Sequence, residues 1–278
     1  MSVENHNEIH DHDGGFAHDL PLMTRRLLVG GIGLAGVGAL LTGCGFGGQG
    51  EANETASAAD GTMCVKDPIE TSGPFPADGT NSKAGQVVNA LNASGVVRSD
   101  IRSCFAGLTG AADGVQLDLE ITLVDVNAAC APLAGHAVYI WHADADGHYS
   151  LYELPERNYL RGVGVSDDKG VVKFTSVLPG CYEGRWPHIH FEVFKNLETA
   201  VSGDKSLLIS QFAIPKASLS AAYSADGRYA ESVTNLGNVS LAKDMVFGDN
   251  TPEQIAAQML AFTGDATSGL QAKGRIAV

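Results

Sequence analysis

The segment from Cys181 to Phe191 concentrates side chains that can do chemistry, because one tyrosine, one arginine and two histidines lie within eleven residues. Side chains alternate between the two faces of a β-strand, so His188 and His190 should point the same way, with Cβ atoms roughly 7 Å apart. Two imidazoles at that separation can bind one metal ion. Ile189 and Val193 would face the core instead. The pattern therefore predicts a strand with one packed face and one metal-binding face.

Two upstream segments each place a tyrosine where an apolar strand gives way to a loop. Residues 138–149 end in Trp-His-Ala-Asp-Ala-Asp-Gly-His-Tyr, and residues 177–182 end in Pro-Gly-Cys-Tyr. The Gly and Pro residues mark the end of each strand. Binding residues are common at such strand ends. Tyr149 and Tyr182 are therefore candidates for the same site as the histidines.

The order of these motifs resembles the intradiol ring-cleavage dioxygenases, the family of protocatechuate 3,4-dioxygenase and catechol 1,2-dioxygenase. A strand ending Trp-His-Ala-Asp-x-Asp-Gly-x-Tyr, then Pro-Gly-x-Tyr, then Arg-x-x-His-x-His carries the resemblance. It covers roughly Val115 to Phe212, with weaker similarity over Glu70–Gly79 and on to Phe247. The match is closest to a secreted, single-chain branch of the family.

The resemblance implies that Tyr149, Tyr182, His188 and His190 are the ligands of an iron(III) ion. Two tyrosinates and one hydroxide would cancel the three positive charges of iron(III), and neutral imidazoles would complete the shell. Free tyrosine has a pKa of about 10, so it ionises at neutral pH only beside such a cation. Gln211 falls where the family often has a glutamine near the site.

The same resemblance implies the reaction and its partners. The enzyme would insert both atoms of O2 into a catechol-type aromatic diol and open the ring between the hydroxyls, giving a muconate-type diacid. Tyr182 would give way to the substrate and accept a proton, while Tyr149 stays bound. Arg185, three residues before His188, would stabilise the negative charge that develops on the ring.

Other interpretations of these residues remain open. Each site residue alone could be structural: Tyr149 a rim aromatic, Tyr182 a turn residue, Arg185 a solvated charge. A cupin-like metal enzyme could use His188 and His190 with Glu192, which shares their strand face, and an exported lipoprotein sandwich could keep the fold without catalysis. An extradiol dioxygenase has no use for two tyrosines. Three other histidines near these motifs are not expected to be ligands: His136, His142 and His148. Two tryptophans are expected in the core or the pocket wall: Trp141 and Trp186.

The N-terminal region has the features of an export signal. Arg25 and Arg26 precede an apolar run, Leu27–Leu41, whose 15 residues fall short of the ~20 that cross a bilayer as a helix. Paired arginines suggest twin-arginine export, and Leu-Thr-Gly-Cys ending at Cys44 resembles a bacterial lipobox. We expect residues 1–44 to be the export signal and residues 45–62 a flexible tether. The protein would be anchored at the cell surface through Cys44, or secreted.

Four cysteines follow Cys44, and an even number in an exported domain indicates disulfides. Three pairings are possible. Cys130 with Cys181, both at the ends of expected core strands, is favoured. This choice leaves Cys64 with Cys104.

Residues 63–278 are expected to form one all-β domain, an antiparallel β-sandwich with loop extensions and little helix. Residues 115–124 alternate, with Leu117, Leu119, Ile121 and Leu123 on the buried face. Further strands are expected at residues 138–141, 171–174, 188–194 and 207–213. Only residues 251–262 predict a helix, with Thr251 as N-cap. The net charge of −14 argues against nucleic acid as a partner, and the oligomeric state is not set by the sequence.

Overall fold

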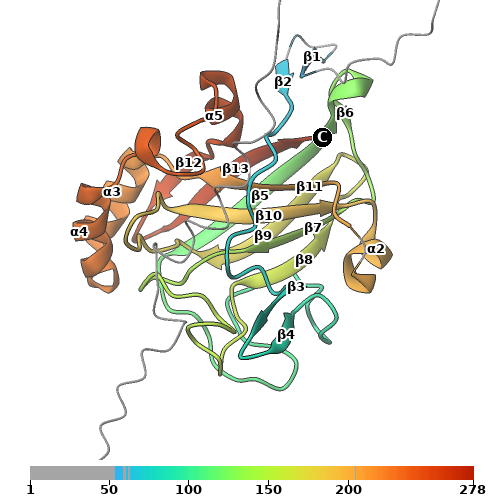
Figure 1. Ribbon diagram of the computed structural model, residues 1–278. Coiled ribbons are helices and arrows are strands. Elements are labelled where there is room, and N and C mark those ends of the chain that lie inside the picture. Colours follow the sequence, from blue (N-terminus) through green and yellow to red (C-terminus); the bar gives the residue numbers. More distant parts are fainter. Residues whose placement is uncertain (1–53, 59–60, 62, 204) are drawn as a thin grey trace, which may run out of the picture. The chain divides into compact units, whose positions relative to one another are not determined.

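Strand β10 (His188–Phe194), which carries both histidines, lies inside a four-stranded antiparallel sheet of the computed structural model (Figure 1). The strand order is β11-β10-β7-β8, with β11 at Leu208–Ala213, β7 at Ala137–Trp141 and β8 at Arg161–Val165. Every residue of β7 and β10 is buried. Both strands are therefore covered on both faces, which suits a rigid platform for a site.

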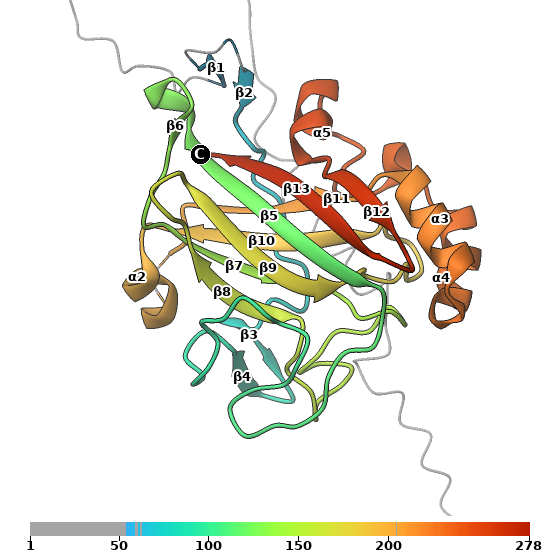
Figure 2. The same cartoon turned by 180° about the vertical axis from the view of Figure 1, so that it is seen from behind.

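The second sheet is built on β5 (Gln116–Asp125). Its strand order is β12-β13-β5-β6, and β9 (Val171–Val177) also pairs with β5. The antiparallel expectation holds for most pairs, but β13 (Gly269–Ala277) runs parallel to β5. Figure 2 shows β5, β9 and β13 on the side of the molecule facing the viewer, with the first sheet behind them.

The core fills the space between the two sheets, as the alternating patterns predicted. Its fully buried side chains include Leu117, Leu119, Ile121 and Leu123 from β5, and Ile189, Phe191 and Val193 from β10. Burying each such side chain is worth about 1.5–3 kcal/mol, so this interface fixes which face of β10 is left for chemistry. The β-sandwich expectation is confirmed.

Short elements complete the described chain. The remaining strands are β1 (Thr55–Ser57), β2 (Met63–Val65), β3 (Asp78–Lys83), β4 (Gln86–Asn89), β6 (Ala131–Pro132) and β12 (Ala261–Asp265). The helices are α2 (Leu197–Ser202), α3 (Lys216–Ala225), α4 (Ala230–Asn238) and α5 (Pro252–Gln258), with 3-10 helices η2 (Val126–Ala128), η3 (Gly227–Tyr229) and η4 (Leu241–Lys243). Strands β1 and β2 pair with each other, as do β3 and β4.

The predicted helix start at Thr251 is correct, because its side chain accepts a hydrogen bond from the Gln254 N–H in a capping box. The helix ends at Gln258 rather than Phe262, since Leu260 N–H bonds to Ala213 of β11 and the chain becomes extended. Helices α3 and α4 were not predicted. Small residues dominate α3, so its sequence lacks a clear apolar stripe.

The structure describes residues 54–58, 61, 63–203 and 205–278, which belong to one compact unit over residues 53–278. The expected export signal, with Cys44, lies outside the described residues. Part of the expected tether, Thr55–Ser57, is instead strand β1, paired with β2. The helices within the described ranges are too short or too polar to span a bilayer.

The disulfide expectation is wrong. Cys64 is bonded to Cys130, and Cys104 and Cys181 are free. Cys130 follows the last residues of β5 and packs in a small cluster with Cys64. Cys181 follows β9, whose Val177 pairs with the first residue of β5. Cys130 and Cys181 therefore lie near opposite ends of β5, where they cannot bond.

Candidate metal centre

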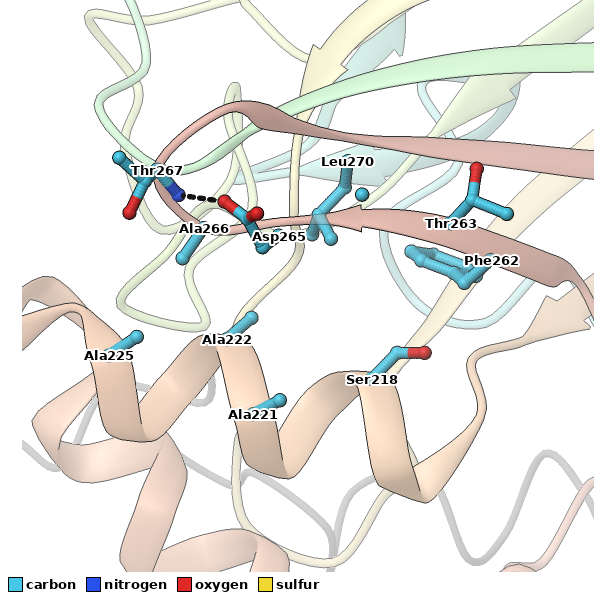
Figure 3. A pocket seen from close by; sticks show the side chains of 11 residues that line it. Ser218, Ala221, Ala222, Ala225, Phe262, Thr263, Asp265, Ala266, Thr267 and Leu270 are labelled. Atoms are coloured by element: carbon cyan, nitrogen blue, oxygen red, sulfur yellow. Dashed lines mark hydrogen bonds between the residues drawn. The ribbon is translucent and has the colours of Figure 1, made fainter.

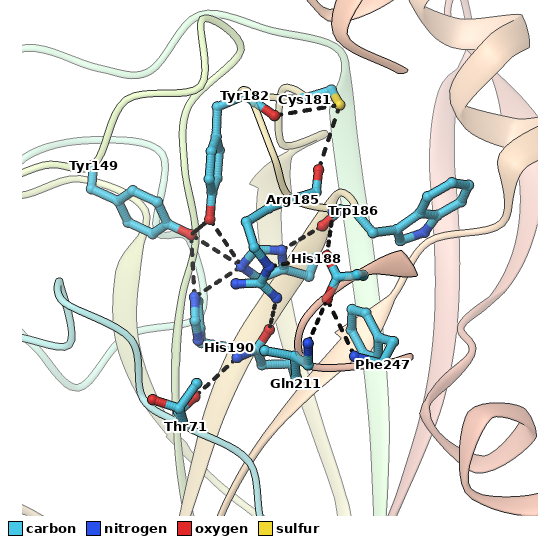
Figure 4. A network of polar contacts seen from close by, with 12 residues as sticks. Thr71, Tyr149, Cys181, Tyr182, Arg185, Trp186, His188, His190, Gln211 and Phe247 are labelled. Carbon is cyan, nitrogen blue, oxygen red and sulfur yellow. Dashed lines mark hydrogen bonds and ion pairs between the residues drawn. The ribbon is translucent and has the colours of Figure 1, made fainter. Parts of the chain in front are cut away.

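Four side chains expected in the site meet at one point of the structure and form what is called here the Tyr–His cluster: Tyr149, Tyr182, His188 and His190 (Figure 4). The Tyr149 hydroxyl lies 3.3 Å from His188 Nε2 and 3.2 Å from His190 Nε2, and the two Nε2 atoms are 3.0 Å apart. The Tyr182 hydroxyl lies 3.5 Å from the Tyr149 hydroxyl and 3.5 Å from His188 Nε2. Donor atoms that share one metal ion at about 2 Å are about 3 Å apart, so the spacing fits a metal centre.

The two histidines are oriented by different contacts. His188 Nδ1 lies 2.5 Å from the Trp186 carbonyl oxygen, which places the proton on Nδ1 and leaves the Nε2 lone pair facing the cluster. His190 instead stacks on Trp141, its cross-strand neighbour, with ring centroids 4.7 Å apart and planes 5° from parallel. Among the described residues, His190 Nδ1 has no hydrogen-bond partner.

Burial sets the protonation of these side chains. It lowers the pKa of His188 to about 3, with help from the Arg185 charge, and holds the pKa of His190 well below 6.5. Both imidazoles are therefore neutral at neutral pH and have lone pairs to donate. Burial also raises the pKa of Tyr149 well above 10, so Tyr149 would become a tyrosinate only with a cation beside it. The donor set thus fits a hard, highly charged metal ion.

The loop after β7 holds Tyr149 deep in the protein, where its side chain is 4% exposed. The Asp144 carboxylate accepts the His148 N–H, and the Glu153 carboxylate accepts the Tyr149 N–H at 2.7 Å. The Phe75 ring packs against Tyr149 with centroids 5.3 Å apart. Backbone and ring contacts together leave this tyrosine little freedom.

The loop after β9 presents Tyr182 at a half-buried position. Its Pro-Gly-x-Tyr motif requires glycine, because a Cβ at Gly180 would collide with carbonyl oxygens of the Tyr149 loop. Helix α4 holds the loop from the other side: Cys181 N–H donates to Ser232, and the Asn235 amide donates to the Cys181 carbonyl at 2.8 Å. The two tyrosine loops thus touch through a close backbone approach.

Arg185 lies beside the cluster in a buried polar network. Its Nε donates to Asp244 at 3.0 Å, and its Nη2 donates to the Gln211 side-chain oxygen at 2.8 Å. Gln211 is opposite His190 on β11, is fully buried, and donates to the Thr71 carbonyl. Gln211 therefore has a place in the site: it orients Arg185.

Asp244 is the site residue that the sequence did not reveal. It accepts hydrogen bonds from Arg185, from the Trp186 N–H and from the N–H groups of Val246 and Phe247. Burial alone would lower the pKa of Arg185, but electrostatic interactions with Tyr182 and Asp244 and the hydrogen bond to Asp244 outweigh burial and raise that pKa. No motif surrounds Asp244, so only its contacts identify it.

Two other histidines of the described chain make contacts away from the cluster. His142 uses both ring nitrogens, on the Ala143 carbonyl and the Ser176 hydroxyl, and His136 contacts the Ala134 carbonyl. Trp186, expected in the core or the pocket wall, is buried and donates to a backbone carbonyl of Ile214. None of these side chains offers a donor atom to the cluster.

Two acidic groups lie near the site without joining it. Glu192 shares the strand face of the histidines but bonds to Asp78, and burial raises its pKa well above 4.5. Asp144, Asp146 and His148 have ligand atoms within 4.8 Å of one another. Both Asp144 oxygens already accept hydrogen bonds, from backbone N–H groups and from the Tyr159 hydroxyl. Asp144 therefore acts as a loop anchor.

A cavity of about 250 Å³ lies apart from the cluster, between helix α3 and the β12–β13 hairpin (Figure 3). Small side chains such as Ser218 and Ala222 face Phe262 across it. No side chain of the Tyr–His cluster lines this cavity.

Comparison with known proteins agrees with the site. Residues 107–201, which include all four cluster residues and Arg185, match the family model described as Dioxygenase (Dioxygenase_C). Chlorocatechol 1,2-dioxygenase from Rhodococcus opacus is 37% identical over 54 residues, 19% of this chain and 21% of that protein. The chain thus matches only about a fifth of that relative's length.

A solved structure shares the fold. The intradiol ring-cleavage dioxygenase from Tetranychus urticae is 22% identical, with a TM-score of 0.57 over 77% of this chain and 94% of that one. In the segment that carries the site the chain matches the Dioxygenase family model, and its fold is similar to that of an intradiol ring-cleavage dioxygenase.

Proposed function

We propose that the chain is a non-haem iron(III) dioxygenase that inserts both atoms of O2 into a catechol-type aromatic diol and opens the ring between its hydroxyls, giving a muconate-type diacid. The observation that carries this proposal is the convergence of two tyrosine oxygens and two neutral imidazole nitrogens at 3.0–3.5 Å. The name of the Rhodococcus opacus relative supports a catechol-type diol as substrate.

Tyr149, Tyr182, His188 and His190 would hold the iron. Bound iron(III) would supply Lewis acidity to the diol oxygens and make the ring reactive toward dioxygen. Tyr149 is buried and packed, so it suits a ligand that stays in place. Tyr182 is half-buried, so its Oη suits a ligand that yields its position and accepts a proton from a substrate hydroxyl.

Arg185 would act as the electrostatic partner of the reacting ring. Asp244 and Gln211 fix its guanidinium before any substrate arrives, so little reorganisation is needed as negative charge develops. A preorganised group of this kind is typically worth a few kcal/mol.

The visible spectrum of the purified protein tests the assignment. Tyrosinate bound to iron(III) gives a red to burgundy colour, and catechol added without oxygen should shift that band. An oxygen pulse should then consume one O2 per catechol. A colourless protein that holds stoichiometric iron would falsify the ligand assignment, and a coloured protein that takes up no O2 would argue for a binding role.

We further propose that the protein is exported and anchored through an acylated Cys44. The paired arginines, the short apolar run and the lipobox-like ending support this location. The Cys64–Cys130 disulfide suits an oxidising compartment. The protein should partition with membranes in detergent-free lysate, and Cys44→Ala should release it. A soluble mature form that begins after residue 44 would exclude the anchor but not export.

A further inference from the structure

We propose that Arg161 is a positioning residue of the metal centre: its guanidinium holds the Tyr149 loop and the segment around Phe75 together as one wall of the site. This inference rests on the proposed function, since it assigns Tyr149 to the metal. The Arg161 side chain donates its hydrogen bonds to groups outside the cluster, so it would position the cluster through those groups.

Every N–H of the Arg161 guanidinium has an acceptor. Nε donates to the Ser150 hydroxyl at 3.0 Å, and Nη2 donates to the Ser150 and Phe75 carbonyls, both at 2.9 Å. Nη1 donates to the Pro76 carbonyl at 2.9 Å and to the Tyr139 hydroxyl at 3.1 Å. Arginine has five N–H donors, so these five contacts use all of them. A lysine could not reproduce this planar fork.

The environment of this charge is unusual. Arg161 is 1% exposed, and it makes no ion pair with any carboxylate of the described residues. A buried charge without a counter-ion is costly unless its hydrogen bonds are complete. By contrast Arg185, the other buried arginine of the site, is paired with Asp244. The hydrogen bonds of the Arg161 guanidinium all go to oxygens of the two segments it joins or to the Tyr139 hydroxyl.

Backbone strain collects around the same contacts. Seven non-glycine residues of the described chain have positive φ, and three of them adjoin Arg161 or its acceptors. Leu160 (φ 56°) precedes Arg161, Leu151 (φ 69°) follows Ser150, and Ala77 (φ 52°) follows Pro76. Bulky residues in this region are unfavourable and persist where surrounding contacts hold them. Arg161 contributes to those contacts through its hydrogen bonds to the neighbouring Ser150 and Pro76 carbonyls.

The two segments that Arg161 joins both reach the metal ligand. Ser150 directly follows Tyr149 in the chain, and the Phe75 ring packs on the Tyr149 ring. Tyr152, under the Arg161 guanidinium at 5.5 Å, also contacts Phe75 and accepts the Ala77 N–H. Loosening Arg161 should therefore move Tyr149 and Phe75 together.

The test compares Arg161→Lys with Arg98→Lys in the full iron-loaded protein. Arg98 is a matched control, because it also donates to backbone carbonyls, including that of Arg161, but touches neither segment. Arg161→Lys should release iron to a chelator about 10- to 100-fold faster, the usual cost of losing a group that orients a ligand. Its tyrosinate band should shift, and amide hydrogen exchange should rise over residues 75–77 and 149–152 in the iron-free protein. Arg98→Lys should lower the Tm with the band and the chelator rate unchanged.

A second variant keeps the inference testable if Arg161→Lys does not fold. Tyr139→Phe removes one acceptor of Arg161 and keeps the ring, so it should show the same shifts at smaller size. If both variants match the Arg98→Lys control in band position, chelator rate and local exchange, Arg161 is only structural and the inference is wrong. If the wild-type protein itself lacks the tyrosinate band, the proposed function fails instead.

Discussion

The two tyrosines of the cluster are held in opposite ways. Tyr149 is buried, its loop is fixed by Asp144 and Glu153, and its ring is packed on Phe75. Tyr182 is half-buried, and helix α4 holds its loop through the backbone of the neighbouring Cys181. The same side-chain chemistry is thus offered once from a deeply buried position and once from a half-buried one, which suits the proposed division into one ligand that stays and one that moves.

Replacement of each tyrosine by phenylalanine should produce the largest contrast. Tyr149→Phe should lose most of its iron and nearly all colour, because the deeply buried position then offers no oxygen. Tyr182→Phe should keep more iron but lose turnover by about 10²–10⁴-fold, the range for a lost proton acceptor. Measurements of iron content, the visible band and O2 uptake test both variants.

Tyr152→Phe is the control for this pair, since Tyr152 lies beside Phe75 but outside the cluster. It should keep most of its iron and colour, with at most the small band shift expected for Tyr139→Phe, because its hydroxyl accepts the Ala77 N–H. Equal iron loss in the Tyr149 and Tyr182 variants would contradict the division into a fixed and a movable ligand.

Arg185→Leu should separate binding from chemistry on the Tyr182 side. The residue stands outside the set of metal ligands, so colour and the anaerobic response to catechol should persist, while ring opening slows by about 10²-fold or more. Arg185→Lys keeps the charge and should recover part of the rate. Unchanged turnover in the leucine variant would show that Arg185 has no electrostatic role.

Asp244→Asn should act on stability first. Removing one partner of a buried ion pair costs about 3–5 kcal/mol, because Arg185 is left unpaired. Burial alone would raise the pKa of Asp244, but Arg185 and backbone donors outweigh it and hold that pKa below 3.8. Near pH 3.8 and just below, the folded state therefore binds fewer protons than the unfolded state. The stabilisation from ionised Asp244 is present above that pH and is lost as the pH falls through the pKa of Asp244 in the folded protein.

Urea unfolding at pH 7 and at about pH 3 checks the sign. The difference in the free energy of unfolding between wild type and Asp244→Asn should be smaller at about pH 3 than at pH 7. A difference that grows on acidification would contradict the stabilising role of the ion pair.

Asn235→Ala should give the smallest effect. It removes one hydrogen bond to the Cys181 carbonyl and should cost about 1 kcal/mol, or about 2–4 °C in Tm for a domain of this size. KM for catechol should change more than iron content, because the movable loop is loosened. Asn238→Ala, on an exposed turn of the same helix, is the matched control and should change neither.

The sequence predicted the parts of this molecule that follow local rules. The alternation of apolar residues along β5 and β10 predicted the core residues, and the His-x-His spacing predicted two imidazoles on one face of the strand. Asp244 escaped prediction because it meets Arg185 across 59 residues of chain, and a single sequence carries no pattern for such contacts. The disulfide failed for the same reason: its pairing depends on which ends of β5 the cysteines approach.

Strand β13 has a consequence for how the protein folds. It lies between β12 and β5, and its register joins Leu270 to Leu117, so the larger sheet is completed by a pairing between distant parts of the chain. Parallel, long-range pairing of this kind raises the contact order and slows folding. Until β13 inserts, β5 presents an open edge of backbone donors and acceptors that another chain could capture. Aggregation during refolding should therefore depend on β13 more than on any element of the site.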